Sequence, residues 1–167
     1  MQDDMVREYE TYRTRLLDLA KMIPESKYDM RPAPDVRSVK EVILHVALNN
    51  YMLLELMGQQ KTPEELFPGL PSGAVERARF VARKNVELEK QISGKQKVLD
   101  MTERAMAAGG EPIKTLPSAK LNTAAMFFDR KSSLGGLQLR AIAHLHEHLG
   151  QLIAYARMAG VTPPWSQ

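Results

Sequence analysis

The sequence predicts an all-α protein, and a four-helix bundle is the simplest arrangement of its elements. Apolar residues recur at intervals of three and four along most of the chain, and no segment shows convincing strand alternation. Capping residues, prolines and glycines mark the ends of four main helices. The 167 residues suit one helical domain spanning residues 1–167, which is large enough to bury its own core.

The first two helices have clear boundaries. The first is predicted over about residues 3–22, and Pro24 stops it because proline cannot continue a helix. The second begins at a capping box, in which the side chains of Ser38 and Glu41 each satisfy a backbone donor. Its apolar stripe continues to Gly58.

The middle of the chain is less regular. Residues 59–73 contain several prolines and glycines and predict a long loop. Residues 74–92 fit a helix that gives way to an irregular piece. Ser93 is the predicted cap of a third main helix over 95–108, which the glycine pair at 109–110 closes.

The last helix follows a loop-like segment in which residues 123–128 are interpreted as a short helix. Either Ser132 or Ser133 caps the last helix, which runs to about Met158 and ends at Gly160.

Composition and charge exclude several classes of protein. There are no cysteines, which removes disulfides, thiolate metal sites, cysteine nucleophiles and iron–sulfur clusters. The net charge is +3, but basic and acidic residues alternate, and the densest basic cluster lacks the interleaved aromatics of a nucleic-acid surface. No window approaches the roughly 20 apolar residues of a membrane span, and the N-terminus does not resemble a signal peptide. We therefore expect a cytoplasmic protein that binds neither nucleic acid nor membrane.

Three of the four histidines lie in one motif of the last predicted helix. Each helical residue advances about 100° around the axis, so His144 and His148 share one face. His146 falls at the other edge of the apolar stripe, and Glu147 faces away from it. Two imidazoles at this spacing can reach one ion, although such a pair is also common without a metal.

A third ligand must come from another helix, and His45 is the only remaining histidine. It lies beside the apolar stripe of the second predicted helix, as His144 and His148 do on the last one. Metal sites in bundles are built from inward-facing side chains of neighbouring helices. The sequence thus predicts a divalent metal site with open coordination positions, the type found in catalytic sites.

Other catalytic patterns do not occur. The histidine motif is not His-Glu-x-x-His, and neither a Gly-x-Ser-x-Gly elbow nor a phosphate-binding glycine-rich loop is present. Glu-x-x-His pairs do not recur on two helices, which argues against a di-iron bundle. The sequence assigns no catalytic residue.

Two segments together resemble the DinB-like superfamily, also called YfiT-like, over nearly the whole chain. The first runs from Arg31-Pro32 through Ser38-Val39-Lys40-Glu41 and His45-Val46-Ala47 to Asn50-Tyr51. The second is His144-Leu145-His146-Glu147-His148-Leu149-Gly150-Gln151-Leu152, followed by Pro163-Pro164-Trp165. The first is similar to the family's capped second helix, and the second to its last helix.

The resemblance implies a DinB-like four-helix bundle that binds a divalent ion, commonly nickel or zinc, at His45, His144 and His148. It also implies a homodimer, and a metal-dependent enzyme that transfers a low-molecular-weight thiol or hydrolyses a small molecule. Asn49, Asn50 and Gln151 could then orient substrate in the pocket. Many relatives carry an acid shortly after the first histidine, where this chain has residues 48–50, Leu-Asn-Asn.

Two alternatives stay open at this stage. The chain could be a non-catalytic metal-binding or stress-related dimeric module, which would gain stability from metal without turnover. It could also be a purely structural bundle that binds no metal.

Overall fold

The computed structural model describes residues 2–166, which form five α-helices and one β-hairpin. The helices are α1 (Gln2–Met22), α2 (Val39–Leu56), α3 (Ala74–Gln91), α4 (Lys95–Thr115) and α5 (Leu134–Met158). The hairpin consists of β1 (Ala124–Phe127) and β2 (Arg130–Ser133), and the short 3₁₀ turns are Glu25–Lys27, Ser118–Lys120 and Pro164–Ser166. The predicted all-α class is therefore confirmed.

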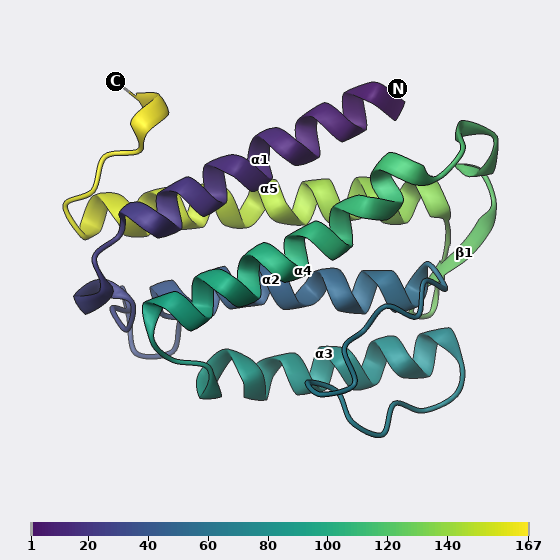
Figure 1. The fold of residues 1–167 in the computed structure, drawn as a ribbon, viewed down its shortest axis with the longest axis horizontal. Coiled ribbons are helices and arrows are strands. Elements are labelled where there is room, and N and C mark those ends of the chain that lie inside the picture. The colour runs from purple at the N-terminus through teal and green to yellow at the C-terminus, as the bar shows by residue number, and fades with distance from the viewer. Residues whose placement is uncertain (1, 167) are drawn as a thin grey trace.

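Helices α1, α2, α4 and α5 form the four-helix bundle that the sequence predicts. In this bundle α1 packs against α4 and α5, and α2 packs against the same two helices. The fifth helix, α3, packs mainly on α2 and lies at one edge of the molecule (Figure 1). It continues to Gln91, so the irregular piece expected within residues 74–92 is reduced to the end of that segment.

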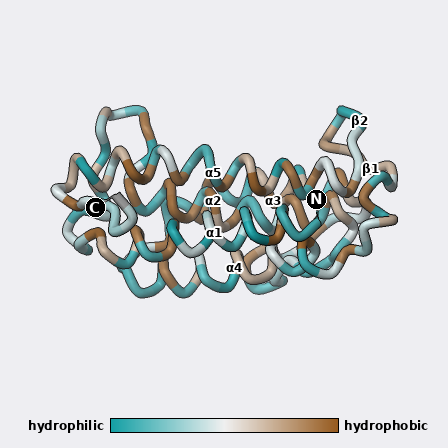
Figure 2. The backbone as a smooth tube through the Cα atoms, turned by 90° about the horizontal axis from the view of Figure 1, so that it is seen from above, coloured by the Kyte–Doolittle hydropathy of each residue, from teal (hydrophilic) through white to brown (hydrophobic). Residues whose placement is uncertain are grey.

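Helix α2 lies at the centre of the molecule because three other helices cover it. Most of its residues are buried, which requires an apolar surface on nearly every side. The outer helices instead alternate apolar and polar residues along their length, as Figure 2 shows in short brown and teal runs. The capping box of Ser38 and Glu41 is present as predicted.

The prediction that a glycine pair closes the third main helix is wrong. Helix α4 continues through Gly109 and Gly110 to Thr115. A Cβ atom at Gly109 would overlap the side chain of Asn50, and one at Gly110 would lie 2.7 Å from Cε1 of Tyr9. These glycines allow α4 to approach α1 and α2 closely, and they do not end the helix.

The prediction of a short helix at 123–128 is also wrong, because Ala124–Phe127 is strand β1. It pairs with β2 in an antiparallel register from Ala124↔Ser133 to Phe127↔Arg130. A short apolar run fits a helix or a strand equally well, and only the partner strand decides. Ser133 caps α5 by accepting a hydrogen bond from the Gly136 amide, which decides between the two predicted caps.

In the described part of the chain, no helix combines the length and apolar character that crossing a bilayer requires.

Candidate metal centre

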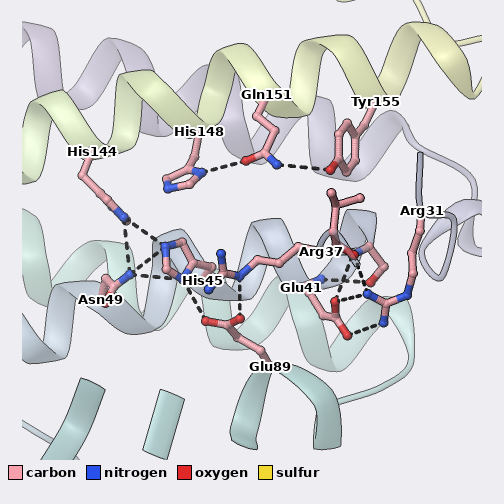
Figure 3. Close-up of polar contacts among 12 residues, drawn as sticks. Arg31, Arg37, Glu41, His45, Asn49, Glu89, His144, His148, Gln151 and Tyr155 are labelled. Atoms are coloured by element: carbon pink, nitrogen blue, oxygen red, sulfur yellow. Dashed lines mark hydrogen bonds and ion pairs between the residues drawn. The ribbon is translucent and has the colours of Figure 1, made fainter. Parts of the chain in front are cut away.

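The bundle brings together three histidines from two helices. His144 and His148 lie one turn apart on α5, and His45 lies opposite them on α2 (Figure 3). Their ring centroids are 5.1 Å apart for His45 and His144, 4.7 Å for His45 and His148, and 4.5 Å for His144 and His148. One nitrogen from each ring lies within 4.8 Å of the other two, so the cluster could hold a metal ion.

The closest pair of ring nitrogens already has the spacing of two ligands. The Nε2 atoms of His45 and His144 are 3.2 Å apart. Two nitrogens at 2.0–2.1 Å from one tetrahedral ion would be roughly 3.3 Å apart. An all-imidazole donor set suits zinc, nickel or copper better than magnesium or calcium, which prefer oxygen ligands.

A buried carboxylate orients the first ring. Nδ1 of His45 lies 2.8 Å from Oε1 of Glu89, whose side chain is only 5% exposed. The second oxygen of Glu89 accepts a hydrogen bond of 2.7 Å from Nε of Arg37. Because a carboxylate accepts, Nδ1 of His45 carries the proton, and its Nε2 lone pair faces the other histidines and the amide of Asn49.

An amide orients the third ring in the same way. Nδ1 of His148 lies 2.8 Å from Oε1 of Gln151, and Nε2 of Gln151 donates to the Tyr155 hydroxyl over 3.1 Å. The proton of His148 is therefore on Nδ1, which leaves the Nε2 lone pair available. Two of the three rings thus have the tautomer that a metal ligand needs.

Burial favours the neutral form of the two imidazoles on α5, His144 and His148. Burial, and after it the electrostatic influence of His148, His45, Arg140 and Arg37, lowers the pKa of His144 to about 3. Burial also lowers the pKa of His148, against the hydrogen bond to Gln151, which raises it. Neutral imidazole is the form that binds a metal ion, so protons compete little with an ion for these two rings at neutral pH.

The three predicted pocket residues lie in different places. The amide nitrogen of Asn49 donates to Nε2 of His45 over 3.1 Å and lies 3.4 Å from Nε2 of His144. Gln151 reaches the cluster only through Nδ1 of His148. Asn50 is buried in the core on the other side of α2, where its amide donates to the Val46 carbonyl.

The remaining residues of the motif stay outside the cluster. His146 is exposed and lies against Tyr12 of α1, with ring centroids 4.6 Å apart. Glu147 is exposed as well, but it lines the mouth of the cavity beside the histidines.

Two cavities flank the cluster and share Arg37. The cavity in front of the three rings has a volume of about 410 Å³. Besides the histidines it is lined by Arg37, Asn49, Met52, Leu53, Phe127, Phe128, Arg140 and Glu147. The second cavity, of about 800 Å³, contacts Glu89 and Gln151, the two partners of the Nδ1 atoms. The rings therefore have an accessible space where open coordination positions would lie.

Sequence reasoning missed Glu89, Arg37, Arg140 and the hairpin phenylalanines. A signal for Glu89 does exist in α3. The buried stripe Ala78, Val81, Asn85, Leu88 includes one polar residue and is followed directly by Glu89, which is also buried. A carboxylate on the buried side of a helix needs a partner, and this could have pointed to a histidine.

Comparison with known proteins agrees with the fold. The sequence model of the DinB superfamily matches residues 8–152. Similar solved structures include a DinB-like protein from Bacillus subtilis, with 17% identity and a TM-score of 0.65 over 95% of this chain and 93% of that chain. A protein from Exiguobacterium sibiricum, described as belonging to the DinB family, has 21% identity and a TM-score of 0.65, covering 95% of this chain and 91% of that one. A conserved protein from Enterococcus faecalis has 15% identity and a TM-score of 0.69, covering 95% of this chain and 96% of that chain. No curated protein matches the chain.

Proposed function

Because the chain belongs to the DinB superfamily, we propose that it is a metal-dependent enzyme for a small molecule, with a divalent ion held by His45, His144 and His148. The observation that carries this proposal is the convergence of three imidazoles beside a cavity of about 410 Å³. Three protein ligands leave positions open for water or substrate, which is the arrangement of catalytic sites. Zinc or nickel is the expected ion.

The reaction we propose is thiol transfer or hydrolysis. A divalent ion lowers the pKa of a coordinated water or thiol and so provides a nucleophile near neutral pH. A low-molecular-weight thiol is an attractive cosubstrate because the chain has no cysteine of its own. Asn49 lies beside two of the ring nitrogens and can donate a hydrogen bond to an oxygen or sulfur atom there.

The hairpin contributes an apolar part of the cavity wall. Phe127 and Phe128 line the cavity that the histidines also line, together with Met52 and Leu53 of α2. Apolar walls lower the local dielectric constant and strengthen the interactions of a charged group inside. We further propose that the protein is cytoplasmic and forms a homodimer. Sedimentation analysis of the purified protein would test the dimer.

The first experiment is metal analysis of protein purified without a histidine tag. We expect about one equivalent of zinc or nickel per chain, lost in His144→Ala and kept in His146→Ala. The second variant is a matched control, because His146 lies on the same helix but outside the cluster. Equal metal content in all three proteins would contradict the assignment.

The second experiment applies panels of thiol-transfer and hydrolase substrates to the same proteins. Turnover in the parent and in His146→Ala, with none in His144→Ala, is the expected result. Full metal occupancy without turnover on any panel would instead favour a non-catalytic binding module.

A further inference from the structure

We propose that the ligand of this site is a small molecule with one carboxylate and an apolar body, in which Arg140 binds the carboxylate and Phe127 and Phe128 contact the apolar part. This inference deepens the proposed function and rests on the same cavity. Three observations support it: the position of Arg140 beside the histidines, the lack of an ion pair at Arg140 within residues 2–166, and the two phenylalanines of the hairpin.

Arg140 lies on the same face of α5 as the histidines, one turn before His144. Its side chain lines the cavity of about 410 Å³ that the three rings also line. A group bound to Arg140 would therefore share one space with a second group that reaches the histidines.

Among the residues that the structure describes, none is a counter-ion of Arg140. Within residues 2–166 its guanidinium forms no ion pair and donates no hydrogen bond, although other arginines here are paired. Arg37, the other guanidinium of the cavity, is bound to Glu89. A carboxylate is the planar anion that a single guanidinium fork binds through two parallel hydrogen bonds.

The charges around the cavity favour an anion with one negative charge. Arg37 and Glu89 balance each other, and Glu147 adds a negative charge at the cavity mouth. Arg140 is then the one guanidinium left to neutralise a ligand. A phosphate, with close to two negative charges, would need the divalent ion as well as Arg140 for compensation, whereas a carboxylate needs Arg140 alone, in metal-free and metal-loaded protein alike.

The aromatic residue Phe127 holds Arg140 in place. The Cζ atom of Arg140 lies 4.9 Å from the centroid of the Phe127 ring, within cation–π range. A cation–π contact takes up no hydrogen bond, so the N–H groups of the guanidinium remain available to a ligand. Arg130 lies 5.5 Å from the centroid of the same ring but does not line this cavity.

The turn of the hairpin places a bulky residue where glycine would fit more easily. Phe128 has φ of 53°, a left-handed conformation that is uncommon for large side chains. The ring of Phe128 lines the cavity, and Asp129 is tied to Arg79 of α3 at 2.6 Å. Residues with a strained backbone cluster at ligand sites. A second aromatic ring in the cavity is a functional reason for phenylalanine at this strained position.

The test is a ¹⁹F NMR titration with two probes of nearly equal shape, 4-fluorophenylacetate and 4-fluorophenylacetamide. Each is titrated into metal-free and zinc-loaded protein. We expect the parent to bind the acid about tenfold more tightly than the amide in both forms, a preference that corresponds to one charge-assisted bidentate contact.

Two variants locate the preference. Arg140→Gln should bind the acid no better than the amide, whereas Arg130→Gln, which alters the other cation on the Phe127 ring, should keep the parent's preference. Arg140 is exposed, so its replacement should leave the circular dichroism spectrum unchanged.

The outcomes separate this inference from the proposed function. Equal binding of acid and amide by the parent would overturn it, and so would a preference that survives in Arg140→Gln, since the carboxylate would then be bound elsewhere. Failure to bind zinc would instead contradict the metal assignment, while the titration of the metal-free protein would still report on Arg140.

Discussion

Glu89 of α3 and His45 of α2 form a hydrogen-bonded pair between two helices, with Oε1 and Nδ1 separated by 2.8 Å. The carboxylate fixes the tautomer and the orientation of the ring, and it increases the basicity of Nε2. Arg37 binds the other oxygen of Glu89, so the carboxylate cannot rotate away from the histidine without losing an ion pair. A helix outside the four-helix bundle thereby controls a residue inside the proposed metal site.

Glu89→Gln should weaken zinc binding by about tenfold to a hundredfold, the usual effect of removing such a partner. The amide can still accept from Nδ1, but it lacks the charge that favours a bound cation. Competition titration against a chromophoric chelator would measure the change. Glu87→Gln, on the exposed face of the same helix, is the control and should keep the affinity of the parent. Equal affinities in both variants would mean that Glu89 does not act on the ion.

The metal-free protein should lose stability as the pH falls from 6.5 to 5. The pKa of His144 is about 3 when folded, against an ordinary value of 6.5, so the unfolded chain binds a proton that the folded chain does not. The free energy of unfolding then falls with pH, by at most about 1.4 kcal/mol per pH unit from this group. Urea unfolding in the presence of a chelator would measure how the free energy of unfolding changes with pH. The pH interval lies above the range in which most carboxylates titrate, so the change can be assigned to histidine.

His144→Gln should flatten that slope, whatever its effect on stability at pH 7. The variant His146→Gln changes a histidine outside the cluster and should retain the slope of the parent. A slope that is the same in all three proteins would be inconsistent with a neutral, buried imidazole at position 144.

Asn49→Asp should tighten zinc binding by about tenfold or more, because a carboxylate beside two ligand nitrogens adds a negative charge and a fourth donor. The amide nitrogen of Asn49 lies 3.1 Å from Nε2 of His45, so the substituted side chain would be within reach of the ion. Asn49→Ala, which adds no charge, should change the affinity much less. A calorimetric titration that finds weaker binding in Asn49→Asp would place residue 49 away from the ion.

Gly109→Ala should destabilise the protein by about 1–3 kcal/mol, even though alanine is the better helix former. The added methyl group would overlap the side chain of buried Asn50 and separate α4 from α2. Gly150→Ala is the matched control, because no atom lies within 4 Å of a Cβ at that position of α5. It should stabilise the protein by about 0.5–1 kcal/mol, and denaturant unfolding would compare the two.

The sequence predicted correctly those features of the fold and the site that depend on residues close together in the chain. The capping box of Ser38 and Glu41 and the spacing of His144 and His148 are confirmed, because each involves residues within one helical turn or so. What the sequence did not predict depends on packing between distant segments. Gly109 suggests a break until Asn50 is found against it, and strand β1 is ambiguous without β2.

The partner of His45 illustrates the same limit. Glu89 follows His45 by 44 positions, and no spacing rule connects them. Only the packing of α3 on α2 brings the carboxylate to the ring. Arg140 was overlooked for a different reason, since its proposed role depends on having no ion pair within residues 2–166 and on a cavity that the sequence cannot outline.

The hydrogen bonds to Nδ1 of His45 and of His148 also have a kinetic consequence. Both rings are already turned toward the common space, so the arriving ion has little protein structure to rearrange. In stopped-flow mixing, association should be a single phase whose rate rises in proportion to ion concentration. The affinity would then be governed mainly by how slowly the ion escapes.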